Sequence, residues 1–414
     1  MISKVLFFCY LLTALSFFFA QEVAAANSNP YWEIQSVDTM KLSRDSARQM
    51  LYDSNADSVI EGQVNRISDI GATHVAIATP YDPEFIPVMK KWVEAARNYG
   101  LNVWFRGNLS GWEGWFGYSA ISKDTHEERI RTFIFDNAEL FESGDIFTPC
   151  PECENGGIGD PRSTGDVIGF RNFLISEYKN ASDAFDSLGK DIKVGYFSMN
   201  GDVAELVMDK ETTQALGNIV VVDHYVKTPE QLVKDIDNLA ILSGGKVVLG
   251  EIGVPIPDIH GFMTESEQEQ WLKHAFSLLV KSSDLVGINY WTASHSSTEL
   301  WSGNGNAKQS VFVLSDYYQP KLLTGTLVNE VEIPIVNAEV SADSYKTVTD
   351  ENGNFTLHIN PVASEIVIKA DTYSEFSIAV NEINSTDKIV LKKTEEGMLF
   401  KILRILYSMG YRFN

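Results

Sequence analysis

Short apolar runs alternate with longer amphipathic segments from about residue 30 to about residue 320. Eight runs are hydrophobic nearly throughout, and several are rich in β-branched or aromatic residues. This pattern is typical of strands that are buried on both faces of a parallel sheet. The predicted strands are Trp32–Val37, His74–Thr79, Asn102–Arg106, Ile146–Pro151, Lys193–Ser198, Ile219–His224, Lys246–Glu251 and Val286–Trp291.

The segments between these runs have helical periodicity. In Glu84–Tyr99 an apolar residue recurs every three or four positions, and Gly100 is suited to ending that helix. Glu267–Lys281 has the same pattern, and Thr264 forms a capping box with Glu267 at its start. Eight strand–helix units predict a (β/α)8 TIM barrel of the α/β class over residues 27–320. A doubly wound sheet is the alternative, but no glycine-rich turn follows the first strand to support it.

Near Pro320 the helical pattern ends, and residues 321–393 predict a small all-β sandwich. Its alternating runs are separated by turn residues. The runs are Thr326–Ile333, Ala338–Ala342, Asn354–Ile359, Glu365–Ala370 and Lys388–Leu391.

This second segment resembles the carboxypeptidase regulatory-like domain. The matching pieces are Gly325-Thr326, Pro334, Asn337-Ala338-Glu339-Val340 and Thr349-Asp350 with Gly353-Asn354-Phe355. The resemblance implies a transthyretin-like sandwich that is an accessory module with no chemistry of its own.

The 414 residues include 33 basic and 56 acidic ones, so the formal net charge is −23. Hydrophobic residues make up 44% and charged residues 21%, as in a folded globular protein. The acidity argues against an electrostatic nucleic-acid binder, because phosphate contacts need a basic face. It also argues against adsorption of the bulk of the protein to anionic lipid.

Residues 1–26 predict a cleavable secretory signal. Lys4 precedes an apolar run from Val5 to Ala20, and the small residues Ala24–Ala26 suit signal peptidase. An uncleaved membrane anchor is the alternative, although the run is a little short for a spanning helix. We therefore expect a secreted, periplasmic or cell-surface protein.

Two cysteines remain once Cys9 leaves with the signal: Cys150 and Cys153, in the sequence Cys-Pro-Glu-Cys. A redox pair or half of a zinc site are the motif-based interpretations, but zinc needs about four ligands and there is no second cysteine pair. A local disulfide, which export permits, or two free thiols are favoured over both.

Residues 394–414 form an apolar tail that also contains Lys401, Arg404 and Arg412. We expect a helix that packs back onto the protein, with an interfacial helix in contact with a membrane as the alternative. Charge interrupts the tail too often for a membrane span.

Polar and aromatic residues gather where the predicted strands end, which is where the active site of a (β/α)8 enzyme lies. Carboxylic acids that follow strands four and seven face one another across the barrel mouth. Glycoside hydrolysis needs such a pair, because one acid protonates the leaving oxygen while the other carboxylate attacks the anomeric carbon. The candidates are Trp104, Arg106, Glu152, Glu154, Asn155, Asn200, His224, Tyr225, Glu251 and Trp291.

Residues 30–315 resemble the clan A glycoside hydrolases, which act with net retention. The shared features are LGEIGVP at strand seven, DHYV at strand six, NYW at strand eight and a Glu after strand four. The resemblance implies that Glu251 is the nucleophile and Glu152 the acid/base. It also places His224 and Tyr225 in the aromatic element that ends strand six, and Trp291 under the sugar that is cleaved.

The segment after strand four departs from the clan, which usually has Asn before the acid/base, where that Asn binds the sugar 2-hydroxyl. Here Pro151 precedes Glu152, and Glu154 is a rival because Asn155 follows it. Strand alternation does not separate the two acids, since both lie past the last sure strand residue with the same parity. The position directly after IFTPCP favours Glu152, and Glu154 is then a sugar ligand or a solvent carboxylate.

These observations predict an exported retaining glycoside hydrolase that acts on an oligo- or polysaccharide, without a metal or an organic cofactor. Trp104, Arg106 and Asn200 are expected to bind substrate. One alternative is a carbohydrate-binding or cell-surface protein whose barrel has lost catalysis, and the missing Asn supports it. A thiol-redox protein is another, but it leaves Glu251 and Trp291 unexplained.

Overall fold

The computed structural model describes residues 31–319, 321–343, 345–383 and 388–394. These residues form two compact units that divide at Pro320, and each unit is described by itself. The predicted signal (residues 1–26) and the predicted tail beyond residue 394 lie outside the described residues. Among the helices of the described part, none has the length and apolar content to cross a membrane.

Eight parallel strands form the centre of the first unit, Pro30–Gln319, in the spatial order β4-β3-β2-β1-β8-β7-β6-β5. Between β4 and the segment before β5 a bridge joins Ile146 to Lys193 and closes the ring. The TIM-barrel prediction is therefore confirmed, with strands β1 (Ile34–Asp38), β2 (His74–Ile77), β3 (Asn102–Phe105), β4 (Ile146–Phe147), β5 (Ser198–Asn200), β6 (Ile219–Asp223), β7 (Lys246–Ile252) and β8 (Leu285–Tyr290).

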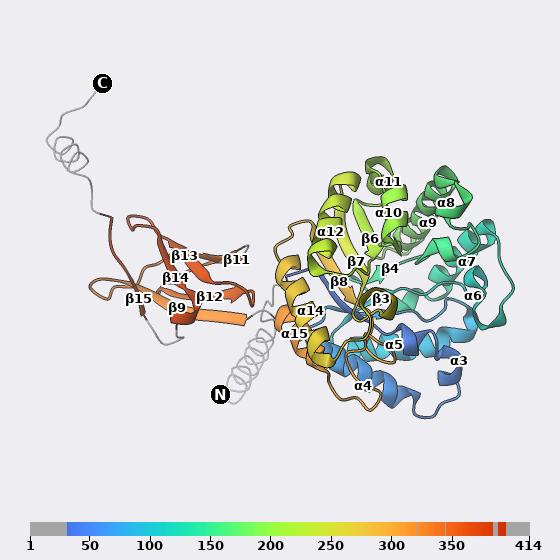
Figure 1. The fold of residues 1–414 in the computed structure, drawn as a ribbon, viewed down its shortest axis with the longest axis horizontal. Coiled ribbons are helices and arrows are strands. Elements are labelled where there is room, and N and C mark those ends of the chain that lie inside the picture. Colours follow the sequence, from blue (N-terminus) through green and yellow to red (C-terminus); the bar gives the residue numbers. More distant parts are fainter. Residues whose placement is uncertain (1–30, 320, 344, 384–387, 395–414) are drawn as a thin grey trace, which may run out of the picture. The chain divides into compact units, whose positions relative to one another are not determined.

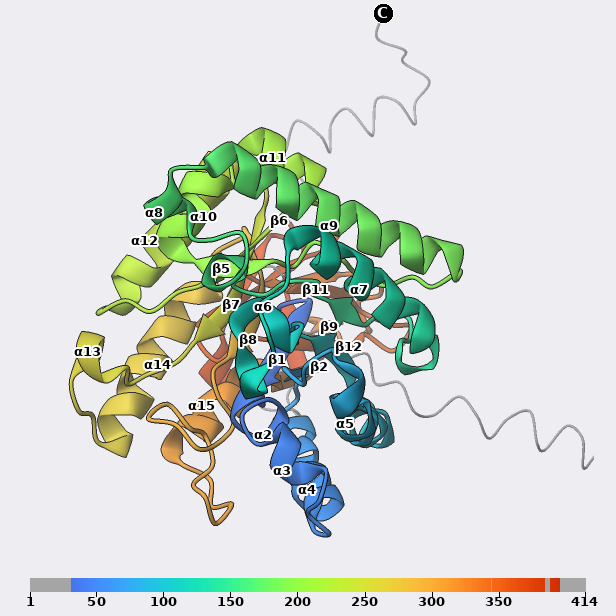
Figure 2. The ribbon, with the colours of Figure 1, turned by 90° about the vertical axis from the view of Figure 1, so that its right-hand side faces the viewer.

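Helices surround the strands of this unit (Figures 1 and 2). The longer ones are α4 (Ala56–Asp69), α5 (Ile86–Asn98), α7 (Lys123–Asp136), α9 (Val167–Ser187), α12 (Pro229–Ser243), α14 (Glu265–Leu279) and α15 (Gln309–Tyr318). The shorter ones are α2 (Met40–Ser43), α3 (Ala47–Met50), α6 (Ser110–Glu113), α8 (Pro161–Thr164), α10 (Gly201–Val207), α11 (Lys210–Ala215) and α13 (Pro257–His260). Single 3-10 turns lie at η1 (Pro83–Phe85), η2 (Trp115–Gly117), η3 (Ala138–Leu140) and η4 (Cys153–Asn155).

Local sequence explains where these helices begin and end. The predicted capping box of α14 is present, since the Thr264 hydroxyl accepts from the Glu267 N–H and the Glu267 side chain accepts from the Thr264 N–H. Just beyond α5, Gly100 has a φ of +71°, a left-handed conformation that glycine adopts without steric cost.

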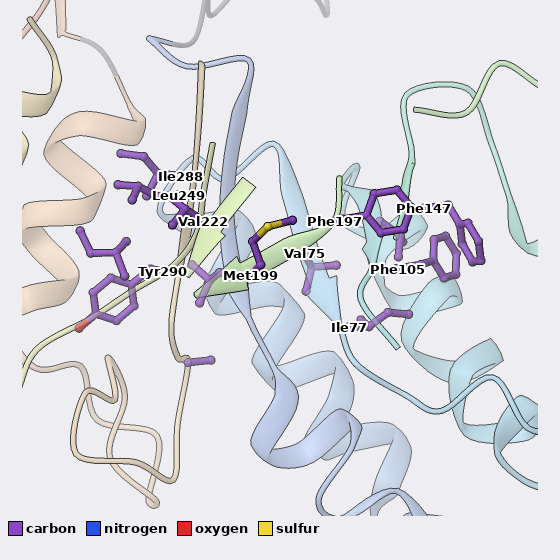
Figure 3. Close-up of a cluster of buried hydrophobic side chains, with 14 of the residues drawn as sticks. Val75, Ile77, Phe105, Phe147, Phe197, Met199, Val222, Leu249, Ile288 and Tyr290 are labelled. Atoms are coloured by element: carbon purple, nitrogen blue, oxygen red, sulfur yellow. The ribbon is translucent and has the colours of Figure 1, made fainter. Parts of the chain in front are cut away.

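Both faces of the strands are buried, as their apolar sequences predict. One set of alternate residues packs under the helices in a large core. Figure 3 shows part of this core, with Val75, Ile77, Phe105, Phe147, Phe197, Met199, Val222, Leu249, Ile288 and Tyr290 labelled. The other set points into the barrel.

The second unit contains two sheets, with strand orders β11-β10-β13-β14 and β12-β9-β15. Both sheets contribute to one hydrophobic core that includes Leu327, Val340, Phe355 and Ile366. The elements are β9 (Lys321–Asn329), β10 (Glu339–Ala342), β11 (Tyr345–Val348), β12 (Asn354–Ile359), β13 (Glu365–Lys369), β14 (Phe376–Ala379), η5 (Val380–Glu382) and β15 (Lys388–Leu391). The all-β prediction for this unit is confirmed, and its likeness to the carboxypeptidase regulatory-like domain stays a prediction.

Candidate active site

The barrel interior changes from apolar to polar along the strands. Its apolar layer consists of Ile34, Ala76, Trp104, Ile146, Tyr196, Val221 and Val248. Strand side chains alternate with a period of two, so the next inward residue lies two positions further along. Most of those residues are polar: Arg106 follows Trp104, for example, Ser198 follows Tyr196 and Asp223 follows Val221. The polar layer therefore lies at the carboxyl ends of the strands, where a TIM-barrel site is expected.

Arg106 is the centre of this polar layer, and only 1% of its surface is exposed. Its Nη1 donates to Asp38 Oδ2 at 2.6 Å, and its Nη2 lies 3.3 Å from Asp223 Oδ1 and 3.4 Å from Glu251 Oε1. Ser198 Oγ accepts from the same Nη2 at 3.1 Å. A buried charge needs such partners, so this arginine holds three carboxylates in fixed positions.

Glu251 enters the polar layer through an irregularity in β7. Val222 pairs with Leu249, but Asp223 pairs with Glu251, so Gly250 is an extra residue opposite β6. Such a bulge redirects the side chains that follow it, which brings Glu251 to the same side as Asp223. Glycine is required there, because a Cβ on Gly250 would lie 2.5 Å from Asp223 Oδ1.

The Glu251 carboxylate is 7% exposed and has two partners. Tyr225 Oη donates to Oε2 at 2.8 Å, and Arg106 lies at Oε1. Burial raises the pKa of Glu251 to about 7, the charge of Arg106 opposes that rise, and the charge of Glu152 adds to it. Glu152, from the segment after β4, therefore lies close enough to influence the Glu251 carboxylate.

Glu152 is half-buried and has a left-handed backbone, with φ 44° and ψ 50°. A non-glycine residue in this region costs about 1–2 kcal/mol. The Glu152 N–H donates to the Ser198 carbonyl at 2.8 Å, which ties the segment after β4 to β5. The negative charge of Glu152 acts on Arg106, Asp223 and Glu251, which places it beside the polar layer.

Glu154 is 4% exposed and has a different environment. Its Oε1 accepts from the backbone N–H of Asn200 at 3.0 Å and from the Asn200 side chain at 3.2 Å, while its buried Oε2 has no partner. Burial raises the pKa of Glu154, and these hydrogen bonds oppose the rise. Asn155, which follows in η4, is exposed. The structure thus joins Glu154 to Asn200, whereas the charge of Glu152 acts on Glu251.

Glu113, at the end of α6, is a third carboxyl group near Glu152 that the sequence analysis missed. Burial, together with the negative charge of Glu152, raises its pKa to about 8. The Asn108 side chain opposes part of this rise in the Glu113 pKa, and its Oδ1 accepts from His126 Nε2 at 2.8 Å. His126 Nδ1 in turn lies 2.5 Å from Glu177. These four residues come from three separate segments of the sequence, so only the fold reveals that they lie together.

Aromatic rings and cations border the same end of the barrel. Trp291 follows β8, and its ring centroid lies 6.2 Å from that of Tyr225 with the planes at 78°. The Lys41 ammonium lies 5.5 Å from the centroid of Trp291, and the Arg44 guanidinium lies 4.8 Å from that of Trp115. Lys41 and Arg44 come from the segment after β1 and were not among the predicted residues.

Two predicted substrate residues lie elsewhere. Trp104 is fully buried in the apolar layer, and its indole N–H donates to Thr148 Oγ1 at 2.9 Å, so it fills the barrel rather than lining an open surface. His224 turns toward helix α12, where its Nε2 lies 2.9 Å from Asp235 Oδ2. These positions correct the expectation that either side chain faces substrate.

The unpredicted members of the polar layer are Asp38, Ser198, Asp223 and Asn289. Asn289 Nδ2 donates to Asp38 Oδ2 at 3.2 Å and to the Gly250 carbonyl at 2.8 Å, which links β8, β1 and the bulge in β7. Asp38 directly follows a predicted strand, so it could have been chosen from the sequence as a strand-end residue in the same way as Glu251. In the part of the chain that the structure describes, no group of three or more His, Cys, Asp or Glu side chains is placed to hold a metal ion.

No family model and no curated protein matches the sequence. Solved structures do resemble the fold. A GH5_18 protein from Bifidobacterium longum subsp. longum, in complex with Manβ1-4GlcNAc, is 12% identical with a TM-score of 0.51, over 73% of this chain and 83% of its own. A GH5_18 protein from Streptomyces cattleya, with the same disaccharide, is 12% identical with a TM-score of 0.51, over 72% and 85%.

This chain has the barrel fold of those proteins. A third similar structure is an FMN-binding β-glucuronidase from a Faecalibacterium species, 12% identical with a TM-score of 0.50, over 90% of this chain and 57% of its own. At these identities the likeness concerns the fold alone, and the chemistry has to be argued from the residues of the polar layer.

Proposed function

We propose that this protein is an exported retaining glycoside hydrolase in which Glu251 is the nucleophile and Glu152 the acid/base. One observation carries the proposal: the buried Arg106 holds the Glu251 carboxylate at 3.4 Å at the carboxyl ends of the strands, and Glu152 follows β4 at the same end, with its N–H bound to the Ser198 carbonyl. Retaining glycosidases use such a pair of carboxyl groups. The similarity to GH5_18 barrels supports a glycosidase of the TIM-barrel type.

In the first step the Glu251 carboxylate attacks the anomeric carbon, and the bond to the leaving oxygen breaks as Glu152 gives that oxygen its proton. The product is a glycosyl ester on Glu251 and a free alcohol. Arg106 and Tyr225 fix the attacking carboxylate, since each contacts one of its oxygens. Fixed partners of this kind contribute by positioning the nucleophile before reaction.

In the second step the ionised Glu152 takes a proton from water, and the resulting hydroxide attacks the anomeric carbon. The ester bond to Glu251 breaks, the sugar leaves with its original configuration, and both glutamates regain their starting protonation. The half-buried position of Glu152 suits this role, because water and an alcohol must both reach it.

A glycoside panel tests the proposal. The GH5_18 structures bind Manβ1-4GlcNAc, so β-1,4-linked mannosyl and N-acetylglucosaminyl substrates belong in the panel beside aryl glycosides and polysaccharides. We expect release of sugar by the mature chain, and a loss of at least about 10⁴-fold in Glu251→Gln, whose amide cannot form the ester.

A second candidate function is carbohydrate binding without turnover. Pro151 favours it, because the clan's Asn ligand for the sugar 2-hydroxyl is missing at that position. Calorimetry on the same panel separates the two functions: binding of a sugar by both the parent and Glu251→Gln, with no product from either, identifies a binding protein.

A further inference from the structure

Cys150 and Cys153 form a disulfide, and Glu152 lies within the four-residue ring that it closes. The Cα atoms of the two cysteines are 5.3 Å apart, which is the span of a tight turn. Pro151 occupies the second position of this turn and Glu152 the third. The predicted acid/base is therefore part of a covalently closed loop.

Backbone preference opposes this conformation at Glu152. A turn with proline in second place and a positive φ in third place normally has glycine or asparagine there. Glu152 has a φ of 44° and keeps a side chain that the turn disfavours. A strained residue of this kind persists where its surroundings hold it, and such residues cluster at active sites.

The ring is anchored at both ends in the barrel core. Cys150 and Cys153 are 0% and 1% exposed. The Cys153 carbonyl accepts from Trp112 Nε1 at 3.2 Å, and the indole of Trp112 stacks on Phe173 at 5.2 Å. The Glu152 N–H is bound to the Ser198 carbonyl at 2.8 Å. Within the part of the chain that the structure describes, the Glu152 carboxyl group makes no hydrogen bond that would orient it.

We propose that the Cys150–Cys153 disulfide is the positioning element of the acid/base: it holds the Glu152 turn so that the carboxyl group faces Glu251 across the barrel mouth. This inference rests on the proposed function and goes beyond it, because it gives the cysteine pair a role in proton transfer. A disulfide that served folding alone would stabilise the chain without any link to the Glu152 side chain.

A double-mutant cycle tests the link. Removing a general acid affects substrates with poor leaving groups most, since a good leaving group departs without a proton. In Cys150→Ala/Cys153→Ala, kcat/KM should fall about 10²-fold or more for a poor leaving group and under about 5-fold for an activated aryl glycoside. In the Glu152→Ala background the same cysteine changes should alter either rate by less than about 3-fold, because the positioned group is gone.

Glu154→Ala is the matched background, because Glu154 is a carboxyl group one residue outside the ring. There the cysteine changes should keep their full effect on the poor leaving group. Two results contradict the proposal. The cysteine changes could lower kcat/KM equally on both substrates, or their loss of kcat/KM could multiply with that of Glu152→Ala in the combined variant. If the thermal melt shows that the cysteine variant is unfolded, the disulfide of the folded parent is reduced instead, and alkylation with mass spectrometry verifies the reduction. A parent that keeps its leaving-group dependence after reduction then contradicts the proposal.

A second measurement needs no turnover. Carbon NMR of protein labelled at glutamate carboxyl groups, with the Glu251 signal assigned by its absence in Glu251→Gln, follows the titration of Glu251. If the disulfide holds Glu152 near Glu251, its removal should lower the Glu251 pKa in the direction that Glu152→Gln does. An unchanged titration refutes the positioning role even in an active enzyme. If removal of the disulfide shifts the Glu251 titration but the parent cleaves no glycoside, the positioning role stands and the proposed function is refuted instead.

Discussion

At the scale of single residues, Glu251 lies between charges of opposite sign. Arg106 stabilises its carboxylate, whereas burial and Glu152 favour its protonated form, and the pKa is raised to about 7. The nucleophile must be ionised, so kcat/KM for an activated aryl glycoside should rise with pH through about 7. In Glu152→Gln that acid limb should move to lower pH, because a neutral amide no longer favours the proton on Glu251.

The pH dependence of kcat/KM reports the ionisation of the free enzyme, so it is the quantity to measure. Glu154→Gln is the control, since it removes a carboxyl group that is bound to Asn200. If the acid limb stays in place in Glu152→Gln and moves in Glu154→Gln, then Glu154 has the role that we assign to Glu152.

The acid/base can also be identified chemically. Glu152→Ala should slow an activated aryl glycoside much less than a natural linkage, by a difference of about 10²-fold or more. Added azide should restore the second step by occupying the vacated space and attacking the glycosyl ester. Glu154→Ala should lower both rates by a similar factor. If the leaving-group dependence and azide rescue follow Glu154, the assignment is off by two residues.

Sequence could predict the acids that lie after β4 and near the end of β7, because each comes at the end of an apolar run. It could not predict that Trp104 fills the barrel or that His224 faces Asp235, since the direction of a side chain depends on strand pairing. Glu113 was missed for a related reason: its relation to Glu152 arises only when the segments after β3 and β4 meet.

At the scale of elements, the bulge in β7 decides the direction of Glu251. Strict alternation from Val248, which points into the barrel, would turn Glu251 outward. We expect Gly250→Ala to lower kcat/KM on every substrate and to destabilise the fold by about 1–3 kcal/mol, because the added methyl group meets Asp223 Oδ1. Substrate kinetics and denaturant unfolding measure both effects.

Gly303→Ala is the matched control, since nothing lies within 4 Å of the added Cβ and the residue is exposed. It should leave kcat/KM and stability nearly unchanged. Full activity in Gly250→Ala would show that the bulge does not set the position of the nucleophile.

All eight predicted barrel strands exist, and six of them differ from their predicted bounds by one or two residues at an end. The other two differ by more, for backbone reasons. The predicted β4 continued to Pro151 and the strand ends at Phe147, because Pro149 and Pro151 lack the N–H that a ladder needs. The predicted β5 began at Lys193, but Gly195 has a φ of +91° and interrupts the pairing, so β5 starts at Ser198.

In the second unit the sequence missed β11 and β14, which are the two edge strands of the four-stranded sheet. Their side chains are mostly half-buried or exposed, so their hydrophobic alternation is weak. The predicted central strands β10 and β13 have the clear alternation that burial on one face produces.

At the scale of the whole molecule, the two units have separate hydrophobic cores. A mature chain that ends at Gln319 should therefore fold and keep its kcat/KM on small glycosides within about 3-fold, since a domain with its own core folds alone. Circular dichroism and kinetics of the shortened chain test this. An intact fold without activity would assign residues 321–394 a part in the site.

A chain that ends at Lys308 provides the contrast. It lacks α15, which contains Tyr318. The Tyr318 hydroxyl donates to the Ser36 carbonyl at 3.0 Å, and the Tyr318 carbonyl accepts from the Gln35 side chain at 3.0 Å. Tyr317 and Leu314 belong to the same barrel core. We expect this shorter chain to be unfolded or to melt at a much lower temperature, because those buried side chains are lost.

The most direct test of the account is to trap the glycosyl-enzyme. A 2-deoxy-2-fluoro glycoside of the preferred sugar, with an activated leaving group, forms the ester with the nucleophile and slows its hydrolysis. Trypsin then releases Glu251 in the peptide Val247–Lys273, and mass spectrometry locates the added sugar. We expect the label on Glu251 and its absence in Glu251→Gln. A label on another residue, or turnover with inverted configuration and no trapped ester, would contradict it.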